Sequence, residues 1–287
     1  MTQTMKFGSI EAVVDTFGGE LISFKKDGRE YAWPGDPAYW TGRAPVLFPV
    51  VCALLDNKTR FEGKEYGIQK HGLIRKKDFT LVSCDDHKAV MQITPDEECA
   101  AKYPYNFLFT VTHTLTEDGF TTTYRVENKD TRPMPFMLGG HAGFSITSMS
   151  NVTLTYACDE DCNLYYTNES GYMDTNLVLG KKITDRKLKL DPADFDRDVI
   201  VATDLKSRRI NLSDAADGRS FDFIFDDFDV IGIWTPPGKD APFVCFEPWN
   251  GAPAYVNEKP DFEDKPWIRT IVPGEAYEAS YSIEIKA

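Results

Sequence analysis

A carboxylate follows an apolar run near the C-terminal end of this sequence. In the segment FVCFEPWNG, Glu247 comes directly after four apolar residues and directly before Pro248. Proline restricts the preceding residue to extended backbone, so we expect Glu247 at the end of a buried strand. A glutamate is rarely buried unless it is paired or takes part in chemistry. Taken alone, the segment fits either a structural carboxylate held by Arg or Lys, or a general base.

The four histidines differ in their surroundings. His141 lies in FMLGGHAGF, where small neighbours leave room for a ligand beside the ring. His71 lies in GIQKHGLIRKKDF, before a glycine and four residues before Arg75. His113 alternates with apolar residues and is expected to be a hydrogen-bonded core residue, whereas His87 lies in a polar turn.

Glu247, His141 and His71 therefore form the candidate chemical set, with Arg75 and Arg43 as possible hydrogen-bond donors. Two His and one Glu can bind a catalytic zinc ion, but these three are about 70 and 100 residues apart and lack local metal-ligand spacing. The same residues also suit metal-free acid–base catalysis, in which a carboxylate takes a proton and an imidazole gives one. The sequence has no G-x-S-x-G motif, phosphate loop or dinucleotide fingerprint.

The elements that position these residues are predicted to be strands. YEASYSIEIK alternates apolar and polar residues, and NFLFTVTHTL and FTTTYRVEN form a hairpin that closes at Asp118-Gly119. AVMQITP, VTLTYAC, SFDFIF and VIGIWTP add further strands, and helical structure is expected only as short turns near DPAYW and DPADFDRD. This pattern predicts one all-β domain over residues 1–287, a sandwich or barrel. The long loop KKDGREYAWPGDPAYWTGRAPV is expected to be functional.

The overall composition argues against two classes of binding partner. The 287 residues include 32 Lys and Arg against 45 Asp and Glu, a net charge of −13, which argues against nucleic acid or an anionic membrane as a partner. The N-terminus lacks the pattern of a signal peptide, and no apolar run is long enough for a membrane span. The six cysteines form no C-x-x-C pair. We expect a cytoplasmic protein with reduced thiols, either a monomer or a homodimer.

Four separated blocks, taken in order, resemble the aldose 1-epimerase (galactose mutarotase) family and its LacX-like branch. They are GGELISFKKDGREYAWPGDPAYWTGRAPVLFPVV, FEGKEYGIQKHGLIRKKDF, GGHAGF and CFEPWNG. The resemblance implies a large antiparallel β-supersandwich with an open cleft on one sheet. It also implies cofactor-independent interconversion of the α and β anomers of an aldose.

The resemblance also implies residue roles. Glu247 matches the family's general base, His141 the general acid that protonates the ring oxygen, and His71 a second histidine that hydrogen-bonds the sugar. At ordinary pKa values Glu247 is ionised at neutral pH, and a nearby carboxylate can keep His141 protonated. Arg75 and Arg43 look like polar groups of the cleft.

Several features leave the substrate open. Trp249 and Trp234 are candidates to stack on a sugar face. Cys52-Ala53 stand where relatives often carry Gly-Arg. The acidic residue that holds sugar hydroxyls in the family has no clear match, and Asp227 and Asp229 are candidates.

Three alternatives remain open at this level. The basic segment KHGLIRKK, with Lys70 and Arg75, is either a solvated loop or a site for a phosphate on the sugar. The chain could also be a non-catalytic sugar-binding or regulatory module, because a fold does not fix a function. A metal-dependent sugar enzyme using the same three residues is the remaining alternative.

Overall fold

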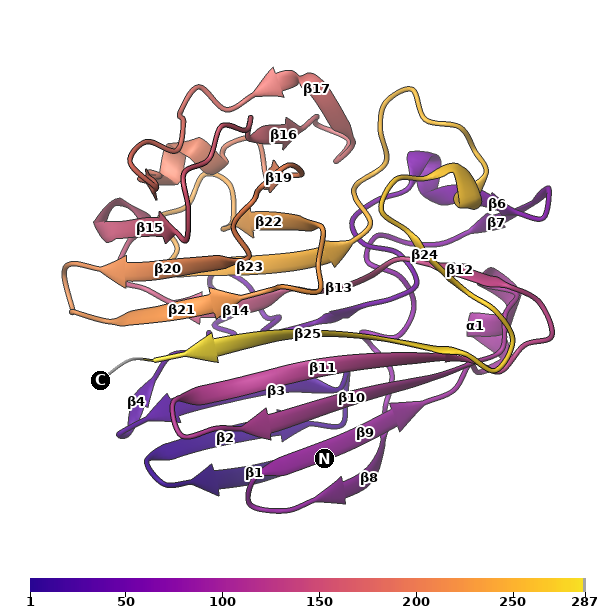
Figure 1. Cartoon of the computed structure of the whole chain (residues 1–287), viewed down its shortest axis with the longest axis horizontal. Coiled ribbons are helices and arrows are strands. Elements are labelled where there is room, and N and C mark those ends of the chain that lie inside the picture. Colours follow the sequence, from indigo (N-terminus) through magenta and orange to yellow (C-terminus); the bar gives the residue numbers. More distant parts are fainter. Residues whose placement is uncertain (286–287) are drawn as a thin grey trace.

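Two large antiparallel sheets dominate the computed structural model, which describes residues 1–285 (Figure 1). Lys286 and Ala287, included in the single-domain prediction, lie outside the described residues. The nine-stranded sheet has the order β18 (Lys187–Leu188), β15 (Val152–Tyr156), β20 (Arg209–Asp214), β21 (Ser220–Ile224), β25 (Ala276–Glu284), β11 (Gly119–Asn128), β10 (Phe107–Leu115), β9 (Lys88–Ile93) and β8 (Thr80–Cys84).

The eight-stranded sheet carries the strands of the candidate site. Its order is β17 (Met173–Val178), β16 (Tyr165–Thr167), β19 (Ile200–Ala202), β22 (Val230–Trp234), β23 (Phe243–Asn250), β13 (Leu138–Gly140) and β5 (Val46–Leu47), and β14 (Ala142–Ser145) also pairs with β23.

Smaller sheets complete the molecule. An N-terminal sheet holds β1 (Thr2–Phe7), β2 (Ile10–Asp15), β3 (Glu20–Lys26) and β4 (Arg29–Glu30). The strands β6 (Lys58–Phe61) and β7 (Lys64–Gly67) form one ribbon, and β12 (Met134–Phe136) pairs with β24 (Arg269–Ile271) in another. The N-terminal sheet packs on the nine-stranded sheet, with the rings of Phe24 and Phe120 4.7 Å apart.

The predicted strands are present; β11 and β25 bury alternate residues on one face, whereas β22 is buried on both faces. In β25, Ala279, Tyr281 and Ile283 are buried, while the residues between them are partly exposed. The hairpin of β10 and β11 pairs without a register shift from Phe107–Asn128 to Leu115–Phe120. His113, on β10, is a buried core residue as expected, bonded to Thr122 Oγ1 and to the Gly19 carbonyl.

Aromatic side chains fill the space between the two large sheets. Phe246 of β23 lies 5.0 Å from the ring of Phe223 on β21, and Phe223 stacks on Tyr281 of β25 at 5.5 Å. Successive strand residues point to opposite faces, so Glu247 lies on the face of β23 that points away from this inter-sheet core. The same alternation that buries Phe246 therefore turns the carboxylate toward the outer side of the sheet.

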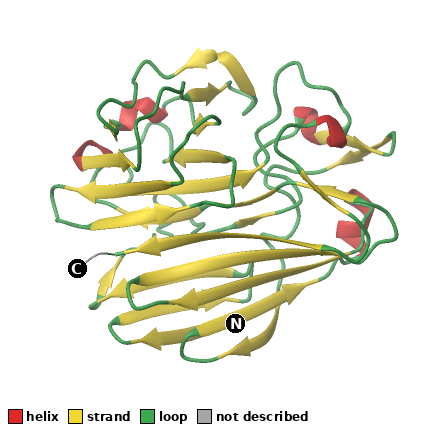
Figure 2. Cartoon of the chain, viewed as in Figure 1, coloured by secondary structure: helices red, strands yellow, loops and turns green. Residues whose placement is uncertain are grey.

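Helical structure is scarce within residues 1–285, as Figure 2 shows. The 3-10 turn η3 (Pro192–Phe195) lies in DPADFDRD as expected, whereas DPAYW forms a turn in which Asp36 accepts from the Ala38 N–H. The short helix α1 (Glu97–Lys102) was not anticipated; it is capped by Asp96, which accepts from the Cys99 N–H. Further 3-10 turns are η1 (Leu55–Asn57), η2 (Met149–Asn151) and η4 (Phe262–Asp264). No helix in this part of the chain is long and apolar enough to cross a membrane.

Candidate active site

Glu247 and His141 lie opposite each other on neighbouring antiparallel strands. On one side β13 pairs Gly139 with Trp249, and on the other β14 pairs Ala142 with Phe246. The same register, continued between them, sets His141 across from Glu247. Cross-strand neighbours on one face have Cβ atoms about 4.5–5.5 Å apart, so the pairing itself brings the two side chains into contact.

The expectation that Glu247 ends its strand is wrong. Strand β23 continues through Pro248 to Asn250, which places the carboxylate in the interior of the strand. The partner strand is interrupted opposite Glu247, between β13 and β14. Pro248, which lacks the N–H that a ladder requires, lies one residue further along, opposite Gly140 at the end of β13. His141 occupies the interruption, so the imidazole lies directly opposite the carboxylate.

The two side chains form a close, buried pair. His141 Nε2 lies 3.2 Å from Glu247 Oε1, and the side chains are 8% and 2% exposed. Burial, with a smaller contribution from Asp198 and opposed by Lys70, raises the pKa of Glu247 well above its ordinary value. Burial lowers the pKa of His141 from 6.5 to about 3. Burial therefore disfavours the charged form of both groups.

These shifts run against the sequence prediction of an ionised Glu247 and a protonated His141. The prediction used ordinary pKa values and a nearby carboxylate, but burial disfavours the charged form of both groups.

His71 is held by the backbone of Cys52. The Cys52 N–H donates to His71 Nδ1 at 3.2 Å, and the His71 N–H donates to the Cys52 carbonyl at 2.8 Å. Because Nδ1 accepts, neutral His71 carries its proton on Nε2 and can donate from there. Burial lowers the pKa of His71 well below its usual value, reinforced by the charges of His141, Lys70 and Arg75.

Glycine after His71 is a steric requirement. A Cβ on Gly72, whose φ is +78°, would lie 2.1 Å from the Phe48 carbonyl oxygen. Only glycine fits this turn, and the turn places His71 in the site. The rings of His71 and His141 are 5.5 Å apart and nearly perpendicular.

Two tryptophans flank the His141 ring. Trp40 stacks on it with ring centres 4.9 Å apart, and Trp234 meets it edge-on at 5.4 Å. Trp234 was a candidate from the sequence and lines the same cavity as the histidines. Trp40 was not singled out, although it belongs to the long aromatic loop that was expected to be functional. That loop does line the site.

Trp249 does not line the cavity, so its proposed stacking on a sugar is wrong. The side chain is fully buried. Its indole covers Gly139 and Gly232, where an added Cβ would lie 2.6 and 2.5 Å from indole atoms. Gly232 is the partner of Glu247 on β22. The indole thus fills the space that these glycines leave and forms part of the packing around Glu247.

The cavity at this site has a volume of about 250 Å³. Five residues named from the sequence line it: Glu247, His141, His71, Arg75 and Trp234. Lys70, named from the basic segment, also lines it, and its Nζ lies 3.5 Å from Oδ2 of Asp198, which sequence reasoning missed. Asp198 also accepts from the Trp234 indole N–H at 2.6 Å.

Asp198, and not Asp227 or Asp229, is the aspartate of the cavity. Asp229 pairs with Arg269 at 2.7 Å, and Asp227 accepts from the Ser280 N–H, both outside the cavity lining. Asp198 has a left-handed backbone, with a φ of +75°. That conformation is uncommon for a residue other than glycine, although aspartate tolerates it. No short pattern in the sequence predicts it.

The basic side chains of the segment around His71 lie in different places in the structure. Lys77 binds Asp96 and Glu98 away from the cavity, whereas Lys70 faces Asp198 inside it. Arg75 lies between the reaction cavity and a neighbouring cavity of about 320 Å³. Within residues 1–285 its guanidinium has no hydrogen-bond or ion-pair partner.

Arg43 lies in the neighbouring cavity and not beside the histidines. Its Nε donates to the Pro34 carbonyl at 2.9 Å. Arg43 and Arg75 therefore line a common space next to the reaction cavity, which has Glu20 and Asp15 on its other walls. Arg43 does not line the reaction cavity, and its contact with a sugar stays a prediction.

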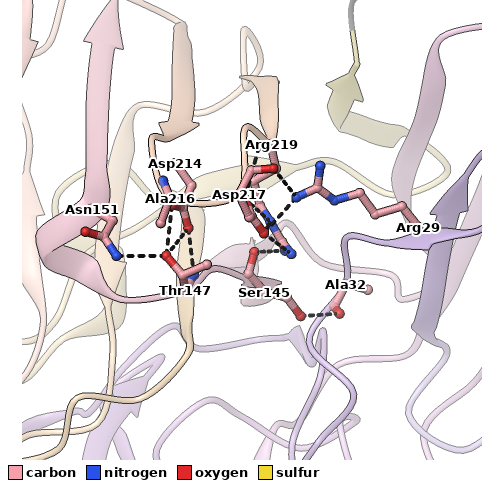
Figure 3. A network of polar contacts seen from close by, with 9 residues as sticks. All are labelled: Arg29, Ala32, Ser145, Thr147, Asn151, Asp214, Ala216, Asp217 and Arg219. Carbon is pink, nitrogen blue, oxygen red and sulfur yellow. Dashed lines mark hydrogen bonds and ion pairs between the residues drawn. The ribbon is translucent and has the colours of Figure 1, made fainter.

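The far end of β14 is anchored by a polar network (Figure 3). The Ser145 hydroxyl donates to the Ala32 carbonyl at 2.8 Å, and the Ser145 carbonyl accepts from Arg219. The Thr147 N–H and hydroxyl both donate to Asp214, a buried carboxylate on β20. These bonds tie β14, which begins directly after His141, to the nine-stranded sheet.

No group of three or more His, Cys, Asp or Glu side chains within residues 1–285 is arranged to hold a metal ion. His71, His141 and Glu247 share the cavity without forming such a group.

Comparison with known proteins identifies the family of the chain. The family model for aldose 1-epimerase matches residues 1–284. The chain belongs to the aldose 1-epimerase family. The plasmid-encoded protein LacX of Lactococcus lactis subsp. lactis is 31% identical over 298 residues that span 99% of both chains, which confirms the LacX-like resemblance.

Solved structures agree with this family assignment. A galactose mutarotase related enzyme from Lactobacillus acidophilus superimposes with a TM-score of 0.93 at 25% identity, covering 100% of this chain and 98% of that one. A galactose mutarotase-like protein from Lactobacillus casei has a TM-score of 0.90, also at 25% identity, with both chains fully covered. The predicted mutarotase-like β-supersandwich is therefore confirmed.

In this member of the aldose 1-epimerase family, the departure at Cys52-Ala53 has a structural consequence. Cys52 is buried, has a left-handed φ of +49° and lines the reaction cavity. The residue that stands in place of the usual glycine thus orients His71 through its main chain. Its side chain brings a thiol to this part of the cavity wall, and Ala53 has only a methyl group at the position of the arginine.

Proposed function

We propose that this protein is an aldose 1-epimerase that opens and recloses a sugar ring by acid–base catalysis with Glu247 and His141. The observation that carries the proposal is the buried His141–Glu247 pair, 3.2 Å apart, in a cavity of about 250 Å³. Pockets for drug-sized ligands commonly measure about 300–1,000 Å³, and this cavity of about 250 Å³ is smaller, which suits a ligand of one pyranose ring.

The reaction needs Glu247 as carboxylate and His141 as imidazolium. One proton on the pair gives this state when it lies on His141, and the Glu247–His141 contact of 3.2 Å is short enough for the proton to pass between the two groups. Sugar hydroxyls and the His71 Nε2–H provide hydrogen bonds that favour the charged state once a sugar is bound. No external proton is needed.

In the catalytic cycle, the Glu247 carboxylate removes the proton from the O1 hydroxyl while His141 donates its proton to the ring oxygen. The bond between C1 and the ring oxygen breaks, which gives the open-chain aldehyde. Rotation about C1–C2 exposes the other face of the carbonyl. The hydroxyl then attacks C1, returns its proton to His141, and O1 regains a proton from Glu247.

Exchange between anomers tests the proposal directly. Freshly dissolved α-aldoses, followed by polarimetry or NMR exchange, should equilibrate faster with the wild-type protein than in buffer. Glu247→Gln keeps the shape but cannot accept the proton, so the rate should fall about 10²–10⁴-fold. Glu117→Gln, on an exposed turn, is the matched control and should leave the rate unchanged.

Two further measurements separate the alternatives. The rate should be bell-shaped in pH, with the alkaline limb flattened in His141→Asn, and insensitive to chelators. Inhibition by a chelator that added metal reverses would favour a metal-dependent enzyme. Sugar binding without exchange would favour a non-catalytic binding module, and a rate in Glu247→Gln within a few-fold of wild type with unchanged circular dichroism would make Glu247 structural.

A further inference from the structure

One ion pair of the reaction cavity has no part in the proton transfers proposed above. Lys70 Nζ lies 3.5 Å from Asp198 Oδ2, and both side chains line the cavity. Asp198 also accepts from the Trp234 indole N–H at 2.6 Å, and that ring meets His141 edge-on at 5.4 Å. The ion pair is therefore connected to the catalytic imidazole through a single ring.

Both members of this ion pair are held in place. Lys70 directly precedes His71, whose N–H donates to the Cys52 carbonyl at 2.8 Å. Asp198 is fixed by the indole hydrogen bond and by its own N–H, which donates to the Phe195 carbonyl at 2.9 Å. Within residues 1–285, Lys70 has no ion-pair partner other than Asp198. The two charges therefore stay together at the wall of the reaction cavity.

Few of the titratable groups around Glu247 carry a charge at neutral pH. Those that face it are His141 between β13 and β14, Lys70, His71 and Arg75 of the loop 68–75, Asp198 before β19, Cys52 after β5 and Cys245 on its own strand. The neighbouring strand β22 adds none, because VIGIW has no titratable residue. Burial lowers the pKa of His71 and raises the pKa of both thiols, so these three groups are neutral. The lysine, the arginine and the aspartate are therefore the fixed charges around Glu247.

Lys70 acts on both members of the catalytic pair. Burial is the main cause that raises the pKa of Glu247; Lys70 opposes it, and Asp198 adds to it. Burial is also the main cause that lowers the pKa of His141, and the charges of Lys70 and Arg75 lower it further. Against the effect of burial, the negative charges nearby raise the pKa of Lys70, so its ammonium stays charged. A positive charge beside both groups disfavours the protonation of each.

We propose that Lys70 and Asp198 are positioning residues of the reaction, whose two charges set the pH range in which Glu247 and His141 act together. The inference rests on the proposed epimerase function. The reaction needs one proton on the pair, so the rate falls when a second proton binds at low pH or the last one leaves at high pH. Because Lys70 disfavours both protonations, it moves both limbs of the pH profile toward lower pH. Asp198 opposes this movement on the acid limb.

The pH profile of kcat/KM tests the inference, because it reports on groups of the free enzyme. Exchange of freshly dissolved α-galactose and α-glucose is followed by polarimetry or NMR. Lys70→Met removes the charge from a side chain that is 48% exposed, so the variant should fold. Both limbs should move to higher pH by about 0.5–1 unit, less than the about 1–3 units typical of a charge at 4–6 Å, because the ion pair is partly exposed. On the acid limb the rate at a fixed pH should fall about 3–10-fold and recover when the pH is raised.

The opposite charge change supplies a second test. Asp198→Asn removes the negative charge but keeps an acceptor for the Trp234 indole, and asparagine tolerates the left-handed φ of +75°. The acid limb should move to lower pH in this variant, and the double variant Lys70→Met/Asp198→Asn should return it close to the wild-type position.

Two variants serve as controls. Lys70→Arg keeps the positive charge and should keep the wild-type limbs. Lys25→Met is the matched control, because Lys25 pairs with Glu11 at 3.9 Å with side chains 39% and 38% exposed, against 48% and 32% for Lys70 and Asp198. Lys25 does not line the reaction cavity, so its loss should move neither limb.

The failure of this inference differs from the failure of the epimerase function. Limbs that stay in place in Lys70→Met, while the wild type catalyses exchange, would overturn the inference alone. A raised KM or a lower rate at every pH with unmoved limbs would do the same, because Lys70 would then be a sugar-binding or structural residue. Absence of catalysed exchange of every α-aldose by the wild type would overturn the epimerase function and the inference together.

Discussion

Gly232→Ala is the substitution that most directly tests the packing around Glu247. Gly232 pairs with Glu247 across β22 and β23. An added Cβ would lie 2.5 and 2.7 Å from two atoms of the Trp249 indole and 3.1 Å from Val199. Both neighbours are buried, so the methyl group has no free direction.

The expected loss is that of an overpacked core. Such insertions typically cost about 1–3 kcal/mol. For a chain of this size we expect the melting temperature to fall by about 2–8 °C. A shift of about 1 Å in a catalytic group can cost about 10²-fold in rate, so displacement of Trp249 toward Glu247 should also lower the anomerisation rate.

Calorimetry and NMR exchange on three variants check this reasoning. Gly180→Ala is the matched control, because no heavy atom lies within 4 Å of its added Cβ. Trp249→Phe removes the indole atoms nearest Gly232, so Gly232→Ala should be less destabilising in that background than in wild type. If the Gly232→Ala variant has the same melting temperature and anomerisation rate as Gly180→Ala, the proposed contact between the indole and Gly232 is refuted.

The remaining predictions concern charge. The folded pKa of His113 is lowered by burial from 6.5 to about 4, so the unfolded chain takes up this proton first as pH falls. Stability is therefore lost below pH 6.5, and urea unfolding should show wild type losing about 2–3 kcal/mol more than His113→Gln between pH 7 and 4.5; parallel pH curves would contradict this. Arg75→Ala should raise KM more for an aldose 6-phosphate than for the free aldose, and added salt should weaken the phosphate effect. Equal effects on both substrates, or no turnover of a phosphate, would assign Arg75 a role unrelated to anions.

The sequence by itself determined the strands and the chemical pair. Alternation of period two is a local property, so it predicted β10, β11 and β25 and placed His113 in the core. Glu247 before Pro248, and His141 and His71 beside glycines, were visible as unusual residues in apolar or small surroundings. Their meeting in one cavity followed from the family resemblance.

The tertiary structure decided what depends on pairing between distant segments. Asp198 and Lys70 reach the cavity from loops about 130 residues apart in sequence, and Asp198 does so through a left-handed backbone that no local pattern predicts. Trp249 lies on the same face of β23 as Glu247. Its indole packs over Gly139 and Gly232 because these residues of the neighbouring strands have no side chain. The raised pKa of Glu247 follows from burial on all sides, because the desolvation that shifts a pKa is produced by the whole assembled fold and not by adjacent residues.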